Sequence, residues 1–350
     1  MFLPKPLIAC LFVSLLPGFA LAQSAVTTQN GNDNEIILEQ SGGTNVASQL
    51  QQGDANFSRI AQDGSSNSAE TAQANFDNQA EVVQSGAANQ AAVFQVSDYY
   101  FGHSASVVQL GADNVADVIQ ADGNGSQATI HQQGAGNVHQ VEQLYYANQL
   151  DSRTIGTGNL TEVIQDGMAS ATAAQLGDNN RILIEQSVNP YGGTVSVLQD
   201  GSSNEALVKQ SGGRYYTGDI ALSQVGTANH AQVSQSAGFS DFSFTQNGTG
   251  NELMATQSTR TGTIRGSSAG DNNRVNINQR FDGPTLDVAQ NGSANEIDVV
   301  QQASYSTASI SQSGNGNVAV LNQLGGFDAP RTSATIIQTG AGNNASITQR

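Results

Sequence analysis

The stretch Gln312-Ser-Gly-Asn-Gly-Asn317-Val-Ala-Val-Leu-Asn-Gln323 contains the pattern that decides the fold of this chain. It reads Gln-x-Gly-x-x-Asn, continues as a short segment in which every second residue is apolar, and closes on a second Gln. Versions of this template recur from Gln29 to Gln349. A motif that returns at a fixed period is typical of an array in which each repeat stacks on its neighbours.

Complete copies of the template, which we call strong cells, alternate with weaker cells that close on Gln and usually lack the Asn. Two further strong cells, Thr154–Asn159 and Ser268–Asn273, lack only the first Gln. One strong and one weak cell form a unit of about 22 residues, as from Gln246 to Ser268. The chain therefore holds about fourteen such units.

Each cell has the period of a β-strand. In the segment 89–95, the residues Asn89, Ala91, Val93 and Gln95 fall on one face. A period of two is that of a strand with one face toward a core, and the regular glycines would interrupt a helix. A single strand cannot bury this face, whereas two strands folded back to back and stacked on identical neighbours can do so. We predict an all-β fold, a β-solenoid of about fourteen two-stranded rungs with amyloid-like cross-β stacking.

Amide side chains stand at both ends of the inward face, where a buried amide needs partners for its donors and its acceptor. Stacking in register provides them, because each Gln or Asn then meets its equivalent about 4.8 Å away in the next rung. The predicted ladder residues are Gln40, Asn45, Gln62, Asn67, Gln84, Asn89, Gln95, Gln109, Asn114, Gln120, Gln132, Asn137, Gln175, Asn180, Gln186, Gln199, Asn204, Gln210, Gln224, Asn229, Gln235, Gln246, Asn251, Gln257, Asn273, Gln279, Gln290, Asn295, Gln301, Gln312, Asn317, Gln323, Gln338, Asn343 and Gln349.

A glycine follows two residues after the first Gln position of each strong cell. A tight reversal between strands needs a backbone with positive φ, which glycine adopts without steric cost. The predicted turn glycines are Gly42, Gly64, Gly86, Gly111, Gly134, Gly156, Gly177, Gly201, Gly226, Gly248, Gly270, Gly292, Gly314 and Gly340.

Composition excludes several classes of protein. The chain has 350 residues, of which 37% are hydrophobic and only 12% charged, and its formal net charge is −17. A strongly negative chain is unsuited to nucleic acid or to anionic membrane surfaces. The repeated register of the polar residues also argues against simple low-complexity disorder.

The first 22 residues have the features of a secretory signal peptide. Lys5 precedes an apolar run from Leu7 to Leu16, and Ala20-Leu21-Ala22 forms a small-x-small cleavage site before Gln23. The run is too short to span a bilayer as a membrane anchor. We therefore expect a signal peptide over 1–22, a short leader over 23–28 and the repeat array over 29–350. The only cysteine, Cys10, would leave with the signal peptide, so no disulfide is expected.

The repeated Gln-x-Gly-x-x-Asn-x-Ala-x-Val-x-Gln, nearly letter for letter at Gln84–Gln95 and Gln199–Gln210, resembles the curlin repeat of curli fibre subunits. This resemblance implies a secreted subunit, major or minor, of functional amyloid fibres at the bacterial cell surface, with roles in adhesion and biofilm matrix. It also implies self-association, a nucleator subunit and dedicated secretion and assembly proteins as partners. The units here are far more numerous than in the familiar curlins, and the leader is shorter.

The termini of the array favour self-association on physical grounds. Soluble solenoids protect their ends with atypical repeats, whereas here the cells continue to Gln349. Uncovered terminal rungs would offer backbone groups and bare amide ladders to another chain. The alternative is a monomeric β-solenoid that acts as an adhesin or surface-binding protein.

Insertions fall only in weak cells, so we expect them along one long edge of the solenoid. They lie at 98–101, 189–192, 214–217 and 325–330 and gather many aromatic residues, together with Tyr145 and Tyr146. Such an edge could mediate lateral fibre contacts or bind matrix polysaccharide. The favoured interpretation is simpler, namely solvated loops of the kind that any solenoid tolerates on one face.

No catalytic or metal site is predicted. The four histidines, His103, His131, His139 and His230, are scattered without metal-ligand spacing, and no Gly-x-Ser-x-Gly elbow lies between a strand and a helix. Acidic turns such as 177–180 are similar to calcium-binding repeats, but Asp is not fixed in place and the period differs. We therefore expect no enzyme activity and no cofactor.

Overall fold

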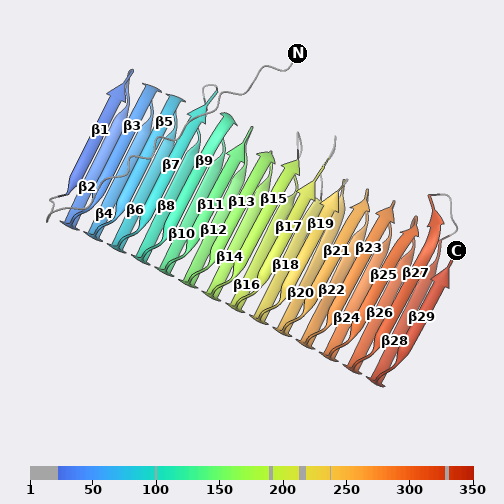
Figure 1. The fold of residues 1–350 in the computed structure, drawn as a ribbon. Coiled ribbons are helices and arrows are strands. Elements are labelled where there is room, and N and C mark those ends of the chain that lie inside the picture. Colours follow the sequence, from blue (N-terminus) through green and yellow to red (C-terminus); the bar gives the residue numbers. More distant parts are fainter. Residues whose placement is uncertain (1–22, 99–100, 189–191, 213–217, 237, 328–330) are drawn as a thin grey trace, which may run out of the picture.

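The chain folds as a flat, two-layered β-solenoid (Figure 1). A computed structural model describes residues 23–98, 101–188, 192–212, 218–236, 238–327 and 331–350. Successive strands alternate between two facing parallel sheets, and no helix occurs in these residues. Accordingly, the described residues include no helix of the length and apolarity that crossing a membrane requires. The predicted all-β solenoid of about fourteen rungs is confirmed.

The odd-numbered strands form sheet A, which has 15 strands in the described residues. They are β1 (Ser24–Asn30), β3 (Val46–Asp54), β5 (Ser68–Phe76), β7 (Gln90–Ser97), β9 (Val115–Gly123), β11 (Val138–Leu144), β13 (Leu160–Gly167), β15 (Arg181–Val188), β17 (Glu205–Ser211), β19 (His230–Ser236), β21 (Glu252–Thr259), β23 (Arg274–Phe281), β25 (Glu296–Ala303), β27 (Val318–Gly326) and β29 (Asn344–Gln349).

The even-numbered strands form sheet B, which has 14 strands in the same residues. They are β2 (Glu35–Gly43), β4 (Phe57–Ser65), β6 (Gln79–Ala87), β8 (Ser104–Ala112), β10 (Gln127–Ala135), β12 (Gln149–Thr157), β14 (Ser170–Asp178), β16 (Thr194–Ser202), β18 (Gly218–Thr227), β20 (Ser240–Thr249), β22 (Thr263–Asp271), β24 (Thr285–Ser293), β26 (Thr307–Asn315) and β28 (Ser333–Ala341).

Register is set by the repeat itself. Gln62 pairs with Gln84 and Gly64 with Gly86 between β4 and β6, so equivalent residues stack directly. A shift by one residue would turn every inward side chain to the solvent, which is why the alternating pattern holds the register.

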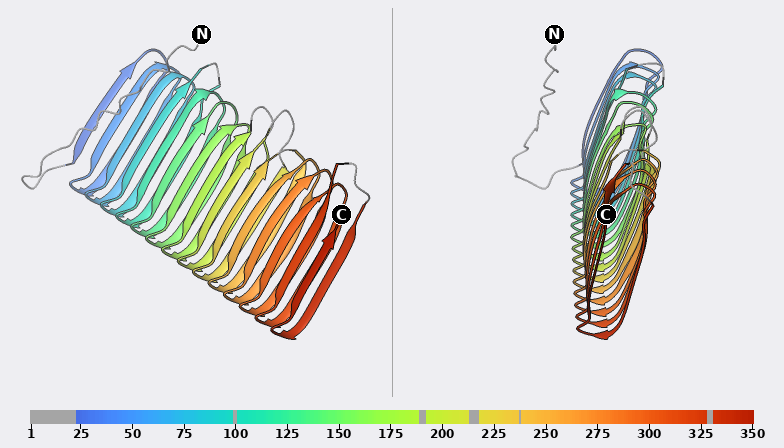
Figure 2. Two further views of the ribbon diagram at one scale, coloured as in Figure 1. Left: turned by 45° about the vertical axis from the view of Figure 1, so that its right-hand side comes forward. Right: turned by 90° about the vertical axis from the view of Figure 1, so that its right-hand side faces the viewer.

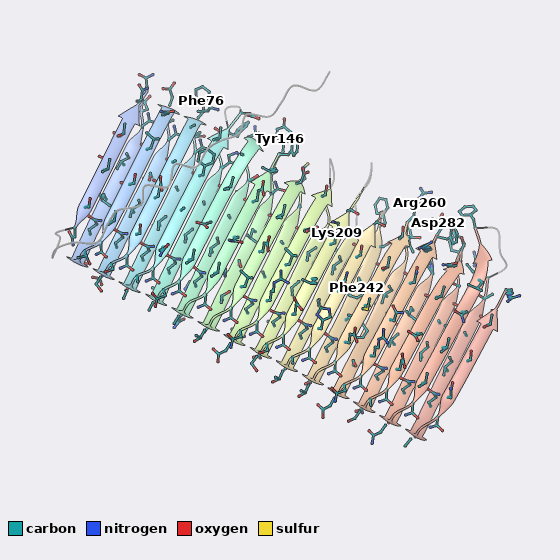
Figure 3. The ribbon with its side chains drawn as sticks, in the orientation of Figure 1. Phe76, Tyr146, Lys209, Phe242, Arg260 and Asp282 are labelled. Carbon is teal, nitrogen blue, oxygen red and sulfur yellow. The ribbon has the colours of Figure 1, made fainter. Side chains whose placement is uncertain are left out.

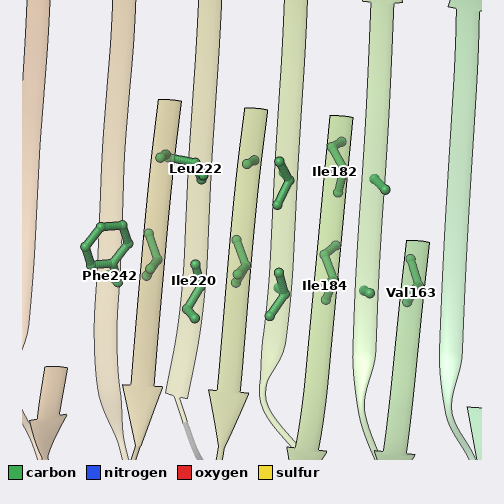
Figure 4. Packing of buried hydrophobic residues seen from close by; sticks show 14 of the residues in the cluster. Val163, Ile182, Ile184, Ile220, Leu222 and Phe242 are labelled. Atoms are coloured by element: carbon green, nitrogen blue, oxygen red, sulfur yellow. The ribbon is translucent and has the colours of Figure 1, made fainter. Parts of the chain in front are cut away.

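The core is the thin layer between the sheets. Inward apolar residues such as Ile182 and Ile184 of β15 are fully buried, and Figure 4 shows them in one layer with Val163, Ile220 and Phe242. Each rung buries its apolar pair only because neighbouring rungs cover it on both sides. The core is therefore continuous along the whole stack rather than divided into separate units.

The two long edges of the slab differ. We call the connections from sheet B to sheet A the strict edge and those from sheet A to sheet B the variable edge. The strict edge, with its Gln-x-Gly-x-x-Asn turns, runs as a regular row along one side of the slab (Figure 2). Each insertion of the sequence falls between a strand of sheet A and the next strand of sheet B, so the insertions belong to the variable edge, as predicted. The insertion residues 99–100, 189–191, 213–217 and 328–330 lie outside the described residues.

The N-terminal boundary needs a correction. Ser24–Asn30, which includes most of the leader expected over 23–28, forms β1 and pairs in register with β3. The array therefore begins at Ser24 rather than at Gln29. The expectation was wrong because Ala25 and Thr27 continue the inward face ahead of Gln29 with no Asn to announce a strand. The predicted signal peptide lies outside the described residues.

Candidate assembly surface

Glutamine ladders run along both edges of the core. In sheet A the ladder is uninterrupted from Gln29 to Gln349, through 14 side-chain hydrogen bonds of 2.7–3.0 Å. In sheet B, Gln84 Nε2 donates to Gln109 Oε1 at 2.8 Å and also to the backbone oxygen of Ser68 in the facing sheet at 2.9 Å. Each amide thus joins its own sheet to the opposite one, which satisfies a group that would otherwise be costly to bury.

An asparagine ladder holds the strict edge. Asn67 Oδ1 accepts two hydrogen bonds from Asn89, one from the backbone N–H at 3.1 Å and one from Nδ2 at 3.0 Å. Asn89 Nδ2 also donates to the backbone oxygen of Gly111 at 3.0 Å. Asn159, whose cell lacks its first Gln, takes part in the same way. The predicted Gln and Asn residues therefore stack as two kinds of ladder, and the inner members are fully buried.

The two ladders have opposite directions. In each bond between two ladder glutamines, Nε2 donates toward the C-terminal end of the stack, as from Gln312 to Gln338. In each bond between two ladder asparagines, Nδ2 donates toward the N-terminal end, as from Asn343 to Asn317. The bond from Nδ2 to a glycine oxygen, as from Asn89 to Gly111, runs the other way. The stack therefore has a polarity, and its two end faces present different hydrogen-bonding groups.

The turn glycines are required by close stacking as well as by conformation. Gly201 has φ +127°, and a Cβ there would lie 2.0 Å from the backbone oxygen of Gly226. The residue directly before the Asn is also left-handed, for example Ala88 at φ 54° and Ser203 at φ 56°. This second position accepts many residue types, so the motif gave no signal for it.

The sheet B ladder is interrupted at the two cells that lack the first Gln. At Thr154, the side chain of His139 reaches across from sheet A, with Nε2 2.8 Å from Thr154 Oγ1. His139 is fully buried, and this desolvation lowers the pKa of its imidazole to about 3. Its position matches the expected inward substitution rather than a ligand site.

At the second interruption, Ser268 Oγ donates to Gln290 Oε1 at 3.2 Å. A Cβ at the nearby Gly266 would lie 2.3 Å from the ring of Phe244. This ring stacks on that of Phe242, with 6.5 Å between the ring centroids (Figure 3). The ring of Phe244 thus fills the space that Gly266, which has no side chain, leaves beside it.

Sequence reasoning missed part of the ladders. Gln29, Gln51, Gln73, Gln143 and Gln165 belong to the sheet A ladder. A second asparagine series, Asn34–Asn56–Asn78, stands on the variable edge with the same bonds as the strict-edge ladder. The signal was present, because 29–34 and 51–56 both read Gln-x-Gly-x-x-Asn.

Outside the core, charged side chains form short surface rows. Arg59 lies between Glu39 and Glu81, with N–O distances of 3.0 and 2.6 Å. On sheet A, Arg181 bonds Glu205 at 2.7 Å, which lowers the pKa of that carboxyl. These pairs are substantially exposed, so each adds little to stability.

Exposed aromatic side chains gather at the variable edge. Phe101, Phe239 and Phe327 are 71%, 57% and 62% exposed, and Figure 3 shows Phe76 and Tyr146 at the same edge. Tyr305 lies 5.2 Å from the guanidinium carbon of Arg331. No cluster of three or more potential metal ligands occurs in the part of the chain that the structure describes.

No family model matches the chain, and no curated protein matches it.

Proposed function

We propose that this chain is a secreted structural subunit that stacks end to end into curli-like amyloid fibres. The supporting observation is that one set of contacts, repeated along the chain, joins each rung to the next. A rung of a second chain would offer the same Gln acceptors, Asn donors and backbone groups as a rung of the first.

The end faces support this proposal. Ala345 and Ile347 of β29 are partly exposed, whereas their stacking partners Ala319 and Leu321 in β27 are fully buried. At the other end, every residue of β1 is exposed. Both faces thus have apolar side chains, and no further strand of the described residues pairs with β1 or β29, so another rung would cover these faces.

Further elements of the proposal follow from the resemblance to the curlin repeat. The fibre would lie outside the bacterial cell, promote adhesion and contribute to the biofilm matrix. A nucleator subunit and dedicated secretion and assembly proteins would be its partners.

The test is fibre formation by the chain from Gln23 to Arg350 after removal from denaturant. We expect a rise in thioflavin fluorescence, unbranched fibres in electron micrographs and a fibre reflection near 4.8 Å. A soluble, monomeric chain without this reflection would contradict the proposal.

A matched pair of variants tests the stacking surface. Ile347→Lys places a charge on the inward face of β29, where stacking would bury it, and we expect roughly a tenfold or larger loss of fibre yield. Thr348→Lys places the same charge on the outward face of the same strand and should leave assembly nearly unchanged. Equal effects of the two variants would show that this face takes no part in assembly.

The alternative function is that of a monomeric solenoid that binds surfaces. The exposed aromatic residues of the variable edge favour it, because such side chains often mediate contacts. A soluble monomer that binds polysaccharide and loses binding on Phe101→Ser and Phe327→Ser would support this alternative.

A further inference from the structure

The two end faces of the described stack do not match by simple translation. Both outermost strands, β1 and β29, lie in sheet A. If β1 of a second copy paired with β29 of the first, sheet B would lack one strand at the junction. A half turn of the second copy about the stack axis removes this gap, because its β1 then pairs with β28 and its β2 with β29.

The first turn of the chain fits this rotated arrangement. The turn 29–34 lies on the variable edge, yet it reads Gln-x-Gly-x-x-Asn like the strict edge. Its backbone is the same as well, since Gly31 has φ +121° and Gly314 of the strict edge has φ +120°. After a half turn, the segment 29–34 stands directly over the last strict turn, 338–343.

The space above Gly340 agrees with this placement. A Cβ added at Gly314 would meet the backbone oxygen of Gly340 at 1.9 Å, as expected for stacked turns. A Cβ at Gly340 meets only Asn343 Nδ2, at 3.6 Å, among the described residues. In the rotated junction, Gly31 of the next copy takes the position above Gly340.

The amide ladders would also continue without a break. Asn34 already acts as a ladder member, since its Oδ1 accepts from the backbone N–H and the Nδ2 of Asn56 at 3.0 and 3.1 Å. Asn343 ends its ladder with an Oδ1 that accepts from no described residue. Across the junction, Asn34 of the next copy would donate to Asn343 Oδ1.

The glutamine ladders meet with the same polarity. Gln338 and Gln349 each donate Nε2 to a facing backbone oxygen and have no described Gln beyond them. In the rotated junction they donate to Oε1 of Gln29 and Gln40 of the next copy.

We propose that successive copies in the fibre are related by a half turn about the fibre axis, with β1 on β28 and β2 on β29. This inference rests on the proposed function, namely end-to-end stacking. It explains why the strict motif appears on the variable edge at the N-terminal turns. It also places the variable edges of successive copies on alternate sides of the fibre.

Single-cysteine chains test the junction directly. The chain from Gln23 has no cysteine of its own, because the only one is Cys10. In the rotated junction, the outward residue Thr28 lies beside Ile337 of the preceding copy; in the unrotated one it lies beside Thr348. Neighbouring strands are about 4.8 Å apart, which is within the Cα separation that a disulfide bridges.

A Thr28→Cys chain is mixed with an Ile337→Cys chain or, in parallel, with a Thr348→Cys chain, and each mixture is assembled and mildly oxidised. We expect disulfide-linked dimers between the two kinds of chain in the first mixture. In the second mixture we expect no such dimers. Each cysteine chain alone is the control for adventitious dimers.

The outcomes separate this inference from the proposed function. The half turn would be overturned if both mixtures form fibres and the dimers appear only in the second mixture or equally in both. The proposal of end-to-end stacking would still stand in that case. Absence of fibres with unmutated chains would overturn both proposals.

Discussion

The strict and variable edges connect the same two sheets, yet they obey different constraints. At the strict edge, each turn lies directly against the next, and a Cβ at Gly64 would lie 2.0 Å from the backbone oxygen of Gly86. The variable edge is uneven: a Cβ at Gly53 would lie 2.0 Å from the backbone oxygen of Asn75, whereas Gly125 has nothing within 4 Å of an added Cβ. Close stacking of backbone on backbone recurs in every unit of the strict edge and fixes its sequence and length, whereas at the variable edge it holds at some turns only and leaves space at others.

The difference has a consequence for function. The proposed fibre would need one surface that repeats without error and could leave another surface free to vary. The asparagine and glycine positions of the strict edge supply the first. Described aromatic residues of the variable edge, such as Phe101 and Phe239, are exposed to solvent and do not belong to the ladders.

The largest expected effect separates the two edges by the same substitution. Gly201→Ala forces an alanine to φ +127° against the oxygen of Gly226, and we expect a loss of about 4 kcal/mol in the free energy of unfolding. Gly125→Ala at the variable edge meets only the cost of positive φ, about 1 kcal/mol. Urea unfolding of dilute chains measures both. Equal losses would refute the claim that stacking fixes the strict edge.

A smaller effect is expected for the glutamine ladder beside the strict edge. Gln199→Ala leaves Gln175 Nε2 without its ladder acceptor and Gln224 Oε1 without its donor, so we expect a loss of about 3 kcal/mol. Gln232→Ala removes a glutamine from the outward face of β19 and should change stability by less than about 0.5 kcal/mol. If the two variants unfold at the same urea concentration, the ladder is not a source of stability.

Much of this architecture could be predicted from the sequence, because the period of two and the recurring Gln and Asn leave few alternatives. The inward face that begins at Asn89, directly before β7, and reaches Gln95 within that strand follows from spacing alone. The asymmetry of the edges follows from where the insertions fall.

Other features depend on contacts that spacing does not reveal. The pairing of His139 with Thr154 joins residues 15 apart in opposite sheets, so neither position announces the other. The start of the array at Ser24 was missed because β1 owes its place to pairing with β3 rather than to its own motif. The asparagine series Asn34–Asn56–Asn78 on the variable edge was not predicted, because the sequence pattern was interpreted as one strong and one weak cell in each unit.

The interruption at Thr154 gives the smallest expected effect, one that depends on pH. His139 is neutral when folded, with a pKa of about 3, against an ordinary value of 6.5. Its Nδ1 has no hydrogen-bond partner among the described residues, and the inward neighbours Ala116, Thr154 and Thr161 from β9, β12 and β13 are uncharged. His139 therefore binds a proton more readily in the unfolded chain than in the folded one. Its contribution to the free energy of unfolding is complete above pH 6.5 and falls as the pH is lowered toward 3.

At pH 5 this loss amounts to roughly 2 kcal/mol relative to pH 7. His139→Ala, which restores the small residue found at the same register in β9, should remove this part of the pH dependence of urea unfolding. His230→Ala, on the outward face, serves as the control and should retain it. If His139→Ala loses as much stability between pH 7 and pH 5 as the unmutated chain, His139 does not titrate from the core, and the interruption at Thr154 is insensitive to acid.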